Sequence, residues 1–144
     1  VSGGGGAMMA GTQTALLMYG GEQPGVRNRT EEWNGSSWTS GNNMSLDRRL
    51  GSHGGTQTYA IAGGGDSNPG IFGNTELWDG TSWASSASMG TARFYQVGGT
   101  SVGSGGVTSN IAATGRTSGS TQSNNCEEFT GGTSVITAST LTTS

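Results

Sequence analysis

The chain has 144 residues, a formal net charge of −3 and 29 glycines, and only 30% of its residues are hydrophobic. No apolar run approaches the roughly 18 residues that a membrane-spanning helix needs, so we expect no membrane span. The six basic residues are all arginines and are scattered along the chain, which argues against nucleic acid as a partner because no basic stripe would neutralise its phosphates. The single cysteine, Cys126, cannot form a disulfide within the chain.

The first third of the chain carries the pattern of a small antiparallel sheet. An apolar run at 15–19 is followed by two glycines, which predicts a short strand buried on both faces. A second strand is expected at 31–33, because Asn34-Gly35 is a strong hairpin signal and Trp38 then begins the return strand.

The same pattern returns in the second third and, in a weaker form, in the last. Gly55 opens a copy of the segment that Gly11 opens, and the segment at 75–83 matches that at 30–38. A period of roughly 45 residues is typical of an array built from one supersecondary unit. An insertion near 100–105 displaces the third copy. We therefore expect a single repeat domain at 1–144 with units 1–44, 45–89 and 90–144, of which the third is degenerate.

Marker residues occur in the same order in the first two units. They are Gly20-Gly21, Trp33-Asn34, Trp38, Met44 and Arg48, and then Gly63-Gly64, Trp78-Asp79, Trp83, Met89 and Arg93. This order resembles the kelch repeat, and it is similar to the kelch-like arrays of bacteriophage virion and tail proteins. The resemblance implies an all-β chain of three antiparallel blades of a β-propeller. Because propellers typically close with four to eight blades, other copies or a longer chain would complete the ring.

The third unit departs from this pattern. Phe129 and, approximately, Val135 stand at the tryptophan positions, Leu141 closes the unit, and 116–125 is of low complexity. The unit could be a cap, a blade of different curvature or a partly irregular segment.

Repeated tryptophans and arginines are expected to be structural anchors: Trp33, Trp38, Trp78, Trp83, Arg48 and Arg93. The tryptophans could stack on sugar rings, but their regular spacing favours packing between successive units. The resemblance implies that the two arginines bond backbone carbonyls or neighbouring acids, a task for which a guanidinium has five donors.

Groups that could perform catalysis are scarce. His53 is the only histidine, so neither a zinc site nor a recognisable catalytic triad is expected, and a propeller enzyme such as a copper oxidase is the weakest alternative. The segment at 66–70 lacks the terminal acid of a calcium loop and fits ordinary turn chemistry. Adjacent acids such as Glu127 and Glu128 should point to opposite faces of a strand. We expect no cofactor, no metal and no enzymatic activity.

Two exposed loops recur at matching places, 22–28 and 66–74, and such loops concentrate binding residues. The expected polar contacts are Arg27, Arg29, Asp66 and Asn68, with Phe72 as an apolar anchor. The sequence thus predicts a structural or adhesive module of a virion or other extracellular assembly. Its partners would be copies of itself, other structural proteins, or a cell-surface glycan or protein receptor. A kelch-type protein interaction module is the alternative, and the loops could also merely connect strands.

Overall fold

The computed structural model describes residues 4–103, 105–130 and 137–140, and these residues form an all-β structure. Three four-stranded antiparallel sheets each take their strands from one unit, in sequence order. The first sheet comprises β1 (Met8–Gly11), β2 (Leu16–Tyr19), β3 (Thr30–Trp33) and β4 (Trp38–Ser40). The second comprises β5 (Ser52–Gly55), β6 (Ala60–Gly63), β9 (Thr75–Trp78) and β10 (Trp83–Ser86). The third comprises β11 (Val97–Gly103), β12 (Gly106–Ala113), β13 (Asn125–Thr130) and β14 (Thr137–Thr140), and a small hairpin joins β7 (Asp66–Ser67) to β8 (Gly70–Ile71).

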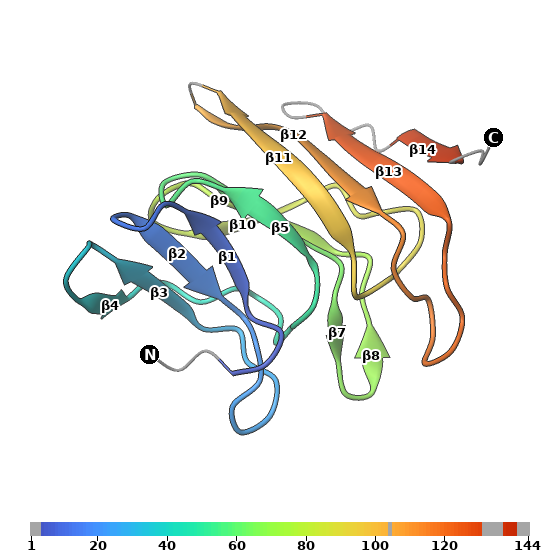
Figure 1. Cartoon of the computed structure of the whole chain (residues 1–144), viewed down its shortest axis with the longest axis horizontal. Coiled ribbons are helices and arrows are strands. Elements are labelled where there is room, and N and C mark those ends of the chain that lie inside the picture. The colour runs from blue at the N-terminus through green and yellow to red at the C-terminus, as the bar shows by residue number, and fades with distance from the viewer. Residues whose placement is uncertain (1–3, 104, 131–136, 141–144) are drawn as a thin grey trace.

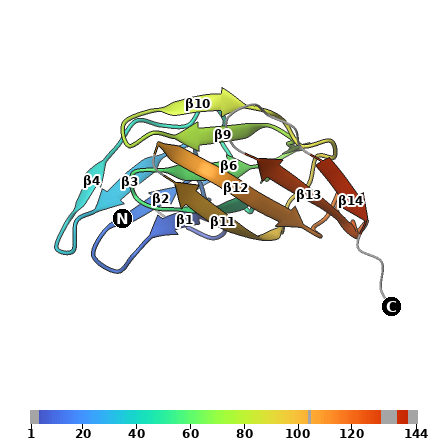
Figure 2. The same ribbon diagram turned by 90° about the horizontal axis from the view of Figure 1, so that it is seen from above.

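The sheets are arranged as a fan around their first strands. β1 and β11 both contact β5, whereas the last strands β4, β10 and β14 lie at the periphery (Figures 1 and 2). Each sheet packs face to face against its neighbours. The strands that form this packing are short, so each sheet contributes only a thin apolar layer.

The hairpin turns form where the sequence predicts them. In the second sheet the Asp79 carboxylate accepts the backbone N–H groups of Thr81 and Ser82, each at 2.8 Å, and these bonds lower the pKa of Asp79. The turn brings Trp78 opposite Trp83, with ring centroids 5.4 Å apart. Asn34 performs the same role in the first sheet, ahead of the pair Trp33 and Trp38.

The strands of the third sheet are not all displaced from their counterparts in the second sheet by the same number of residues. Ala112 pairs with Glu127 as Ala62 pairs with Glu76. Counted along the sequence from their counterparts in the second sheet, the residues of β12 are therefore displaced by one position less than those of β13. As a result, Thr114 occupies the place of Gly64, and both have a positive φ, 57° and 63°. A threonine in this left-handed region is uncommon, so the sequence of the third unit does not show the glycine pair of the first two units at this place. The expected counterparts near Val135 and Leu141 lie outside the described residues.

The first core lies between sheets 1 and 2. Its buried members are Met8, Ala10, Leu17, Tyr19, Met44, Ala60, Ala62 and Trp78, and Trp83 packs against them. The Trp83 indole N–H donates to the Thr30 hydroxyl at 2.9 Å, and its ring lies 4.8 Å from that of Tyr19. A second cluster of Ile61, Val107 and Phe129 joins sheet 2 to sheet 3.

The two tryptophan pairs differ in burial although their local geometry is alike. Trp78 is only 2% exposed, because sheet 1 covers it. Trp33 is half-buried, and its indole N–H donates to the Gln13 carbonyl at 3.0 Å just as that of Trp78 donates to the Gln57 carbonyl at 2.9 Å. Trp33 is therefore less buried than its counterpart Trp78, because Trp33 and Trp38 lie on the face of sheet 1 that no other described sheet covers.

Replacing Trp78 by Ala should lower the free energy of unfolding by about 3 to 5 kcal/mol, since a large buried side chain leaves a cavity. Trp33→Ala is the matched control and should cost clearly less. Chemical denaturation of both variants measures this difference, and equal losses would contradict the assigned burial.

Burial also predicts a pH dependence. Tyr19 is buried, donates its hydroxyl to the Ile61 carbonyl at 2.8 Å, and has a pKa raised by burial above the ordinary value of 10.0. The folded state thus favours the neutral phenol. The resulting stability is fully present below pH 10 and is lost as the pH rises, by up to about 1.4 kcal/mol per pH unit for one proton.

The free energy of unfolding of Tyr19→Phe should therefore fall less between pH 10 and pH 12 than that of the unmodified chain. At pH 7 the variant should be the less stable of the two, because it lacks the hydrogen bond to the Ile61 carbonyl. Urea titrations across this range test the difference, because all other titrating groups are common to both proteins. Parallel pH profiles would refute the assignment.

Candidate functional site

One end of the fan carries three equivalent loops, one from each sheet. They connect β2 to β3, β6 to β9 and β12 to β13, and they project on the same side of the molecule (Figure 1). Each folds back as a miniature hairpin through the pairs Glu22 with Val26, Asp66 with Ile71, and Arg116 with Gln122. The first residue of each hairpin also pairs with the segment that leads into the first strand of the same sheet, which we call the connector. The pairs are Gly5 with Glu22, Arg49 with Asp66, and Phe94 with Arg116. Glu22, Asp66 and Arg116 are therefore equivalent positions.

Asp66, one of the expected polar contacts, is engaged within the scaffold. Its carboxylate accepts two bonds from the Arg49 guanidinium at 3.1 and 3.2 Å, and Arg49 also pairs with Glu22. The hydrogen bond to Asp66 is the main cause that raises the pKa of Arg49. Arg49 thereby links the loop that contains Glu22 to the loop that contains Asp66.

The other expected contacts do not form one cluster. Asn68 is exposed at the tip of the hairpin between β7 and β8, and Phe72 is half-buried behind it. Arg27 is half-buried and bonds the Gln23 carbonyl of its own loop at 3.4 Å. Arg29 is exposed beside Glu31, around a hollow away from the loop tips.

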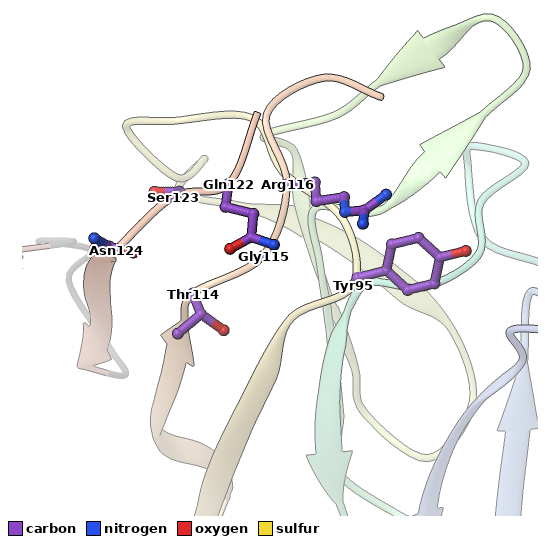
Figure 3. A pocket seen from close by; sticks show the side chains of 7 residues that line it. All are labelled: Tyr95, Thr114, Gly115, Arg116, Gln122, Ser123 and Asn124. Atoms are coloured by element: carbon purple, nitrogen blue, oxygen red, sulfur yellow. The ribbon is translucent and has the colours of Figure 1, made fainter. Parts of the chain in front are cut away.

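A hollow of about 490 Å³ lies beside the third loop (Figure 3). Its lining is Tyr95, Thr114, Gly115, Arg116, Gln122, Ser123 and Asn124. Tyr95 is 55% exposed, and the Arg116 guanidinium lies 5.8 Å from the centre of its ring. This distance is within the range of a cation–π contact.

The charge of Arg116 is not balanced within the described chain. Asp66 meets Arg49 in the second unit, but the connector position that faces Arg116 is Phe94. No described carboxylate lies within 4.0 Å of Arg116, and one of its nitrogens donates to the Gly119 carbonyl at 3.0 Å. Since a guanidinium has five donors, it retains donors that can bind an incoming group.

Backbone bonds fix Arg116 and Tyr95 in place. The N–H groups of Phe94 and Arg116 each donate to the carbonyl of the other residue, at 3.0 and 2.8 Å. Tyr95 has a positive φ of 54°, as does Leu50, its counterpart in the preceding connector, at 59°. The backbone N–H of Tyr95 donates to the Leu50 carbonyl at 2.9 Å. This bond joins the two neighbouring connectors.

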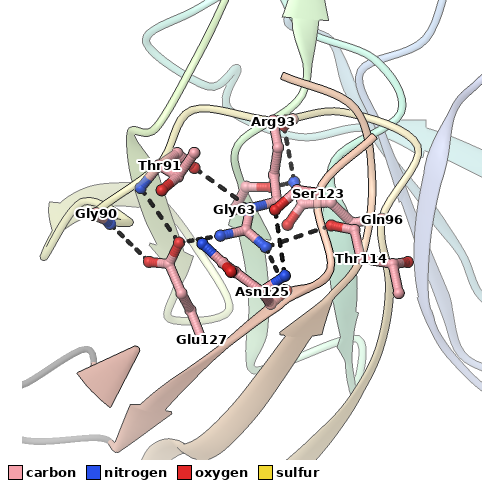
Figure 4. A network of polar contacts seen from close by, with 9 residues as sticks. All are labelled: Gly63, Gly90, Thr91, Arg93, Gln96, Thr114, Ser123, Asn125 and Glu127. Carbon is pink, nitrogen blue, oxygen red and sulfur yellow. Dashed lines mark hydrogen bonds and ion pairs between the residues drawn. The ribbon is translucent and has the colours of Figure 1, made fainter. Parts of the chain in front are cut away.

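Behind the hollow, Arg93 organises the chain (Figure 4). The fully buried guanidinium pairs with the Glu127 carboxylate and donates to the carbonyls of Asn125 at 2.7 Å and Thr114 at 3.3 Å. Glu127 in turn accepts the backbone N–H groups of Gly90 and Thr91, at 2.6 and 3.2 Å. These bonds set the two ends of the third loop, and so they position the lining of the hollow.

Arg48 makes the equivalent bonds one sheet earlier. It pairs with Glu76 at 2.7 Å and donates to the carbonyls of Ala62, Gly64 and Asn74 at 2.8 to 3.2 Å. Burial lowers the pKa of Arg48, and the negative charge of Glu76 opposes that shift.

The described residues offer little for metal or covalent chemistry. No three of their His, Cys, Asp or Glu side chains gather as metal ligands would. Cys126 is half-buried, and Glu127 and Glu128 point to opposite sides of β13, one buried and one exposed. The described part of the chain also contains no helix with the length and apolar character of a membrane span.

Comparison with known proteins places the fold but not the family. No family model matches the chain, and no curated protein matches it. A solved structure described as the structure of YjhT is similar, with a TM-score of 0.71 and 18% sequence identity. The match covers 93% of this chain and 45% of that one, so the chain spans less than half the length of its neighbour. At this identity the likeness establishes the fold alone.

Sequence reasoning overlooked Tyr95 and Arg116. The third loop reads as low complexity, yet Arg116 is the only charged residue between Arg93 and Glu127. Aligning the connectors places Tyr95 opposite Leu50, and an aromatic residue in place of an aliphatic one was the available signal.

Breaking the buried ion pair should be costly. Glu127→Gln should lower the free energy of unfolding by about 3 to 5 kcal/mol, because it leaves the Arg93 charge buried and unpaired. Glu22→Gln breaks the more exposed pair with Arg49 and should cost less than about 1 kcal/mol. Equal losses in urea denaturation would show that Arg93 is not the organising group.

Proposed function

We propose that this chain is a kelch-like segment of a β-propeller that serves as a non-catalytic attachment module of a virion or other extracellular assembly. The observation that carries the proposal is the set of three equivalent loops on one end of a fan of sheets, with an unbalanced arginine beside an exposed tyrosine. The consecutive strand order within each sheet, the repeat markers and the likeness to a longer solved structure support the propeller.

The chemistry of the hollow favours a polar ligand rich in hydroxyl groups, such as a cell-surface glycan. The exposed Tyr95 ring offers an apolar surface with a polar edge. Gln122, Ser123 and Asn124 add amide and hydroxyl groups that both donate and accept hydrogen bonds. Arg116 adds the one positive charge of the lining.

A binding role also agrees with the stiffness of the frame. Arg93 and the paired connector backbones hold the base of the loop, while Thr114, Gln122 and Asn124 are exposed. Binding residues on a rigid scaffold lose less conformational freedom when a ligand binds. No catalytic step is proposed, because the hollow contains no acid and no nucleophile paired with a base.

The double variant Tyr95→Ala and Arg116→Gln should weaken binding of immobilised glycans at least tenfold without changing the unfolding midpoint by more than a few degrees. A glycan array followed by titration of the retained ligand measures this loss. Point variants are preferred to replacement of a whole loop, because replacing 66–74 would remove the Asp66 carboxylate that Arg49 binds.

Met9→Gln is the matched control, since Met9 is 48% exposed on β1, outside the lining of the hollow. Binding that survives in the folded double variant would reject this site. Retention of a protein receptor but of no glycan would reject the ligand class while leaving the attachment role intact.

A further inference from the structure

Tyr95 also lines a second hollow, which lies where the connectors enter the first strands of the sheets. We call it the inner hollow, and the one around Arg116 the polar hollow. The inner hollow measures about 300 Å³. An apolar part of its lining comes from Ala7, Met8 and Leu50, and Tyr95, His53 and Gln96 line the rest. Its chemistry therefore differs from that of the polar hollow, although the two share one aromatic ring.

Two residues of the inner hollow have an unusual backbone conformation. Leu50 and Tyr95 have φ values of 59° and 54°, and the equivalent residue of the first connector is Gly6, with a φ of 73°. Backbone bonds establish this equivalence, because Leu50 donates to the Gly6 carbonyl as Tyr95 donates to the Leu50 carbonyl, each at 2.9 Å. Bulky residues are uncommon in this region, and such strain concentrates at ligand sites. A leucine and a tyrosine at these places thus favour a binding role for the hollow.

His53 gives the inner hollow a hydrogen-bond acceptor. Its Nδ1 lies 3.0 Å from the carbonyl oxygen of Gly51. Because a carbonyl oxygen only accepts, Nδ1 carries the proton of the neutral imidazole, and the other ring nitrogen, Nε2, is an acceptor. No described residue bonds Nε2, and the side chain is exposed. An incoming N–H or O–H group can therefore bind there.

The lining is held in place from behind. Gln96 is 8% exposed, and its amide donates to the carbonyls of Gly63 and Arg93 at 3.2 and 2.9 Å. Met8 is fully buried in the core between sheets 1 and 2. A ligand that enters the inner hollow therefore has few side chains to order.

We propose that the inner hollow binds the N-acyl group of an N-acylated amino sugar while the rest of the glycan occupies the polar hollow. The amide N–H of the acyl group would donate to Nε2 of His53, and its methyl group would pack against Ala7 and Leu50. Tyr95 connects the two parts, because it lines both hollows and its ring points away from Ser123 and Asn124 (Figure 3). This inference rests on the attachment role proposed above and specifies its ligand.

The N-acyl group is chosen because it uses both features of the hollow. It carries a hydrogen-bond donor and an apolar methyl group side by side. A sugar hydroxyl can donate to His53 but offers no apolar surface to Leu50. The methyl group of a deoxy sugar offers that surface but no donor, and it would leave Nε2 of His53 desolvated and without a partner, which is costly.

Two saccharides that differ at a single carbon test the inference, one with an acetamido group there and the other with a hydroxyl group. In calorimetric titrations the acetamido form should bind roughly tenfold more tightly, because it gains a hydrogen bond and buries a methyl group. In saturation-transfer NMR the acetyl methyl protons should receive the strongest transfer of all the ligand protons.

Variants of the inner hollow identify the two contacts. His53→Phe keeps a flat ring but removes the acceptor, and Ala7→Leu fills the apolar part. Each should reduce the difference between the two saccharides to about twofold or less, while the hydroxyl form binds as it does to the unmodified chain. Met9→Gln, on β1 but outside both linings, is the matched control and should keep the full difference. Unfolding midpoints show that each variant is folded.

The outcomes separate this inference from the attachment role. Equal binding of both saccharides by the unmodified chain, or a difference that survives both variants of the inner hollow, would overturn the inference and leave the attachment role standing. If the unmodified chain binds neither of these saccharides nor any glycan of the array, the glycan ligand and this inference are rejected together.

Discussion

The structure depends on one repeated interaction, a buried arginine that connects each sheet to the next. Arg48 and Arg93 leave the connectors and terminate on the carbonyls and the single carboxylate of the following sheet. A buried charge without partners costs several kcal/mol, so the guanidinium can be accommodated only when the glycine turn, the loop end and the glutamate are all in place. One side chain thereby couples strand register, loop geometry and the spacing of two sheets.

The same coupling explains how a glycine-rich chain with a small core supports exposed loops. The apolar layers between the sheets are thin, and the tryptophan pair between sheets 1 and 2 and the smaller cluster of Phe129 provide most of the packing. The loops connect the strands that the arginines clamp, so variation in a loop tip leaves the frame unchanged. At the base of the loops, the equivalent positions Glu22, Asp66 and Arg116 carry charges of opposite sign.

The end of the array differs from its interior for a physical reason. Sheet 2 has a neighbour on both faces, whereas one face of sheet 1 keeps its tryptophan pair half-buried and a hollow beside Glu31.

The sequence by itself predicted β2, β3 and β4 of the first sheet, their counterparts β6, β9 and β10 in the second, and the hairpin turns, because turn chemistry and short apolar runs are local. The first strand of each sheet, β1 and β5, carries no such local signal. The repeated spacing also predicts Trp78, Arg48 and Arg93 as structural anchors, and the structure buries all three side chains. Tertiary structure alone decided that Trp33 is half-buried, that Asp66 is neutralised by Arg49, and that Thr114 replaces a glycine. It also brought Tyr95 beside Arg116, 21 residues further along the chain. These features depend on which surfaces meet, and no local pattern in the chain encodes that.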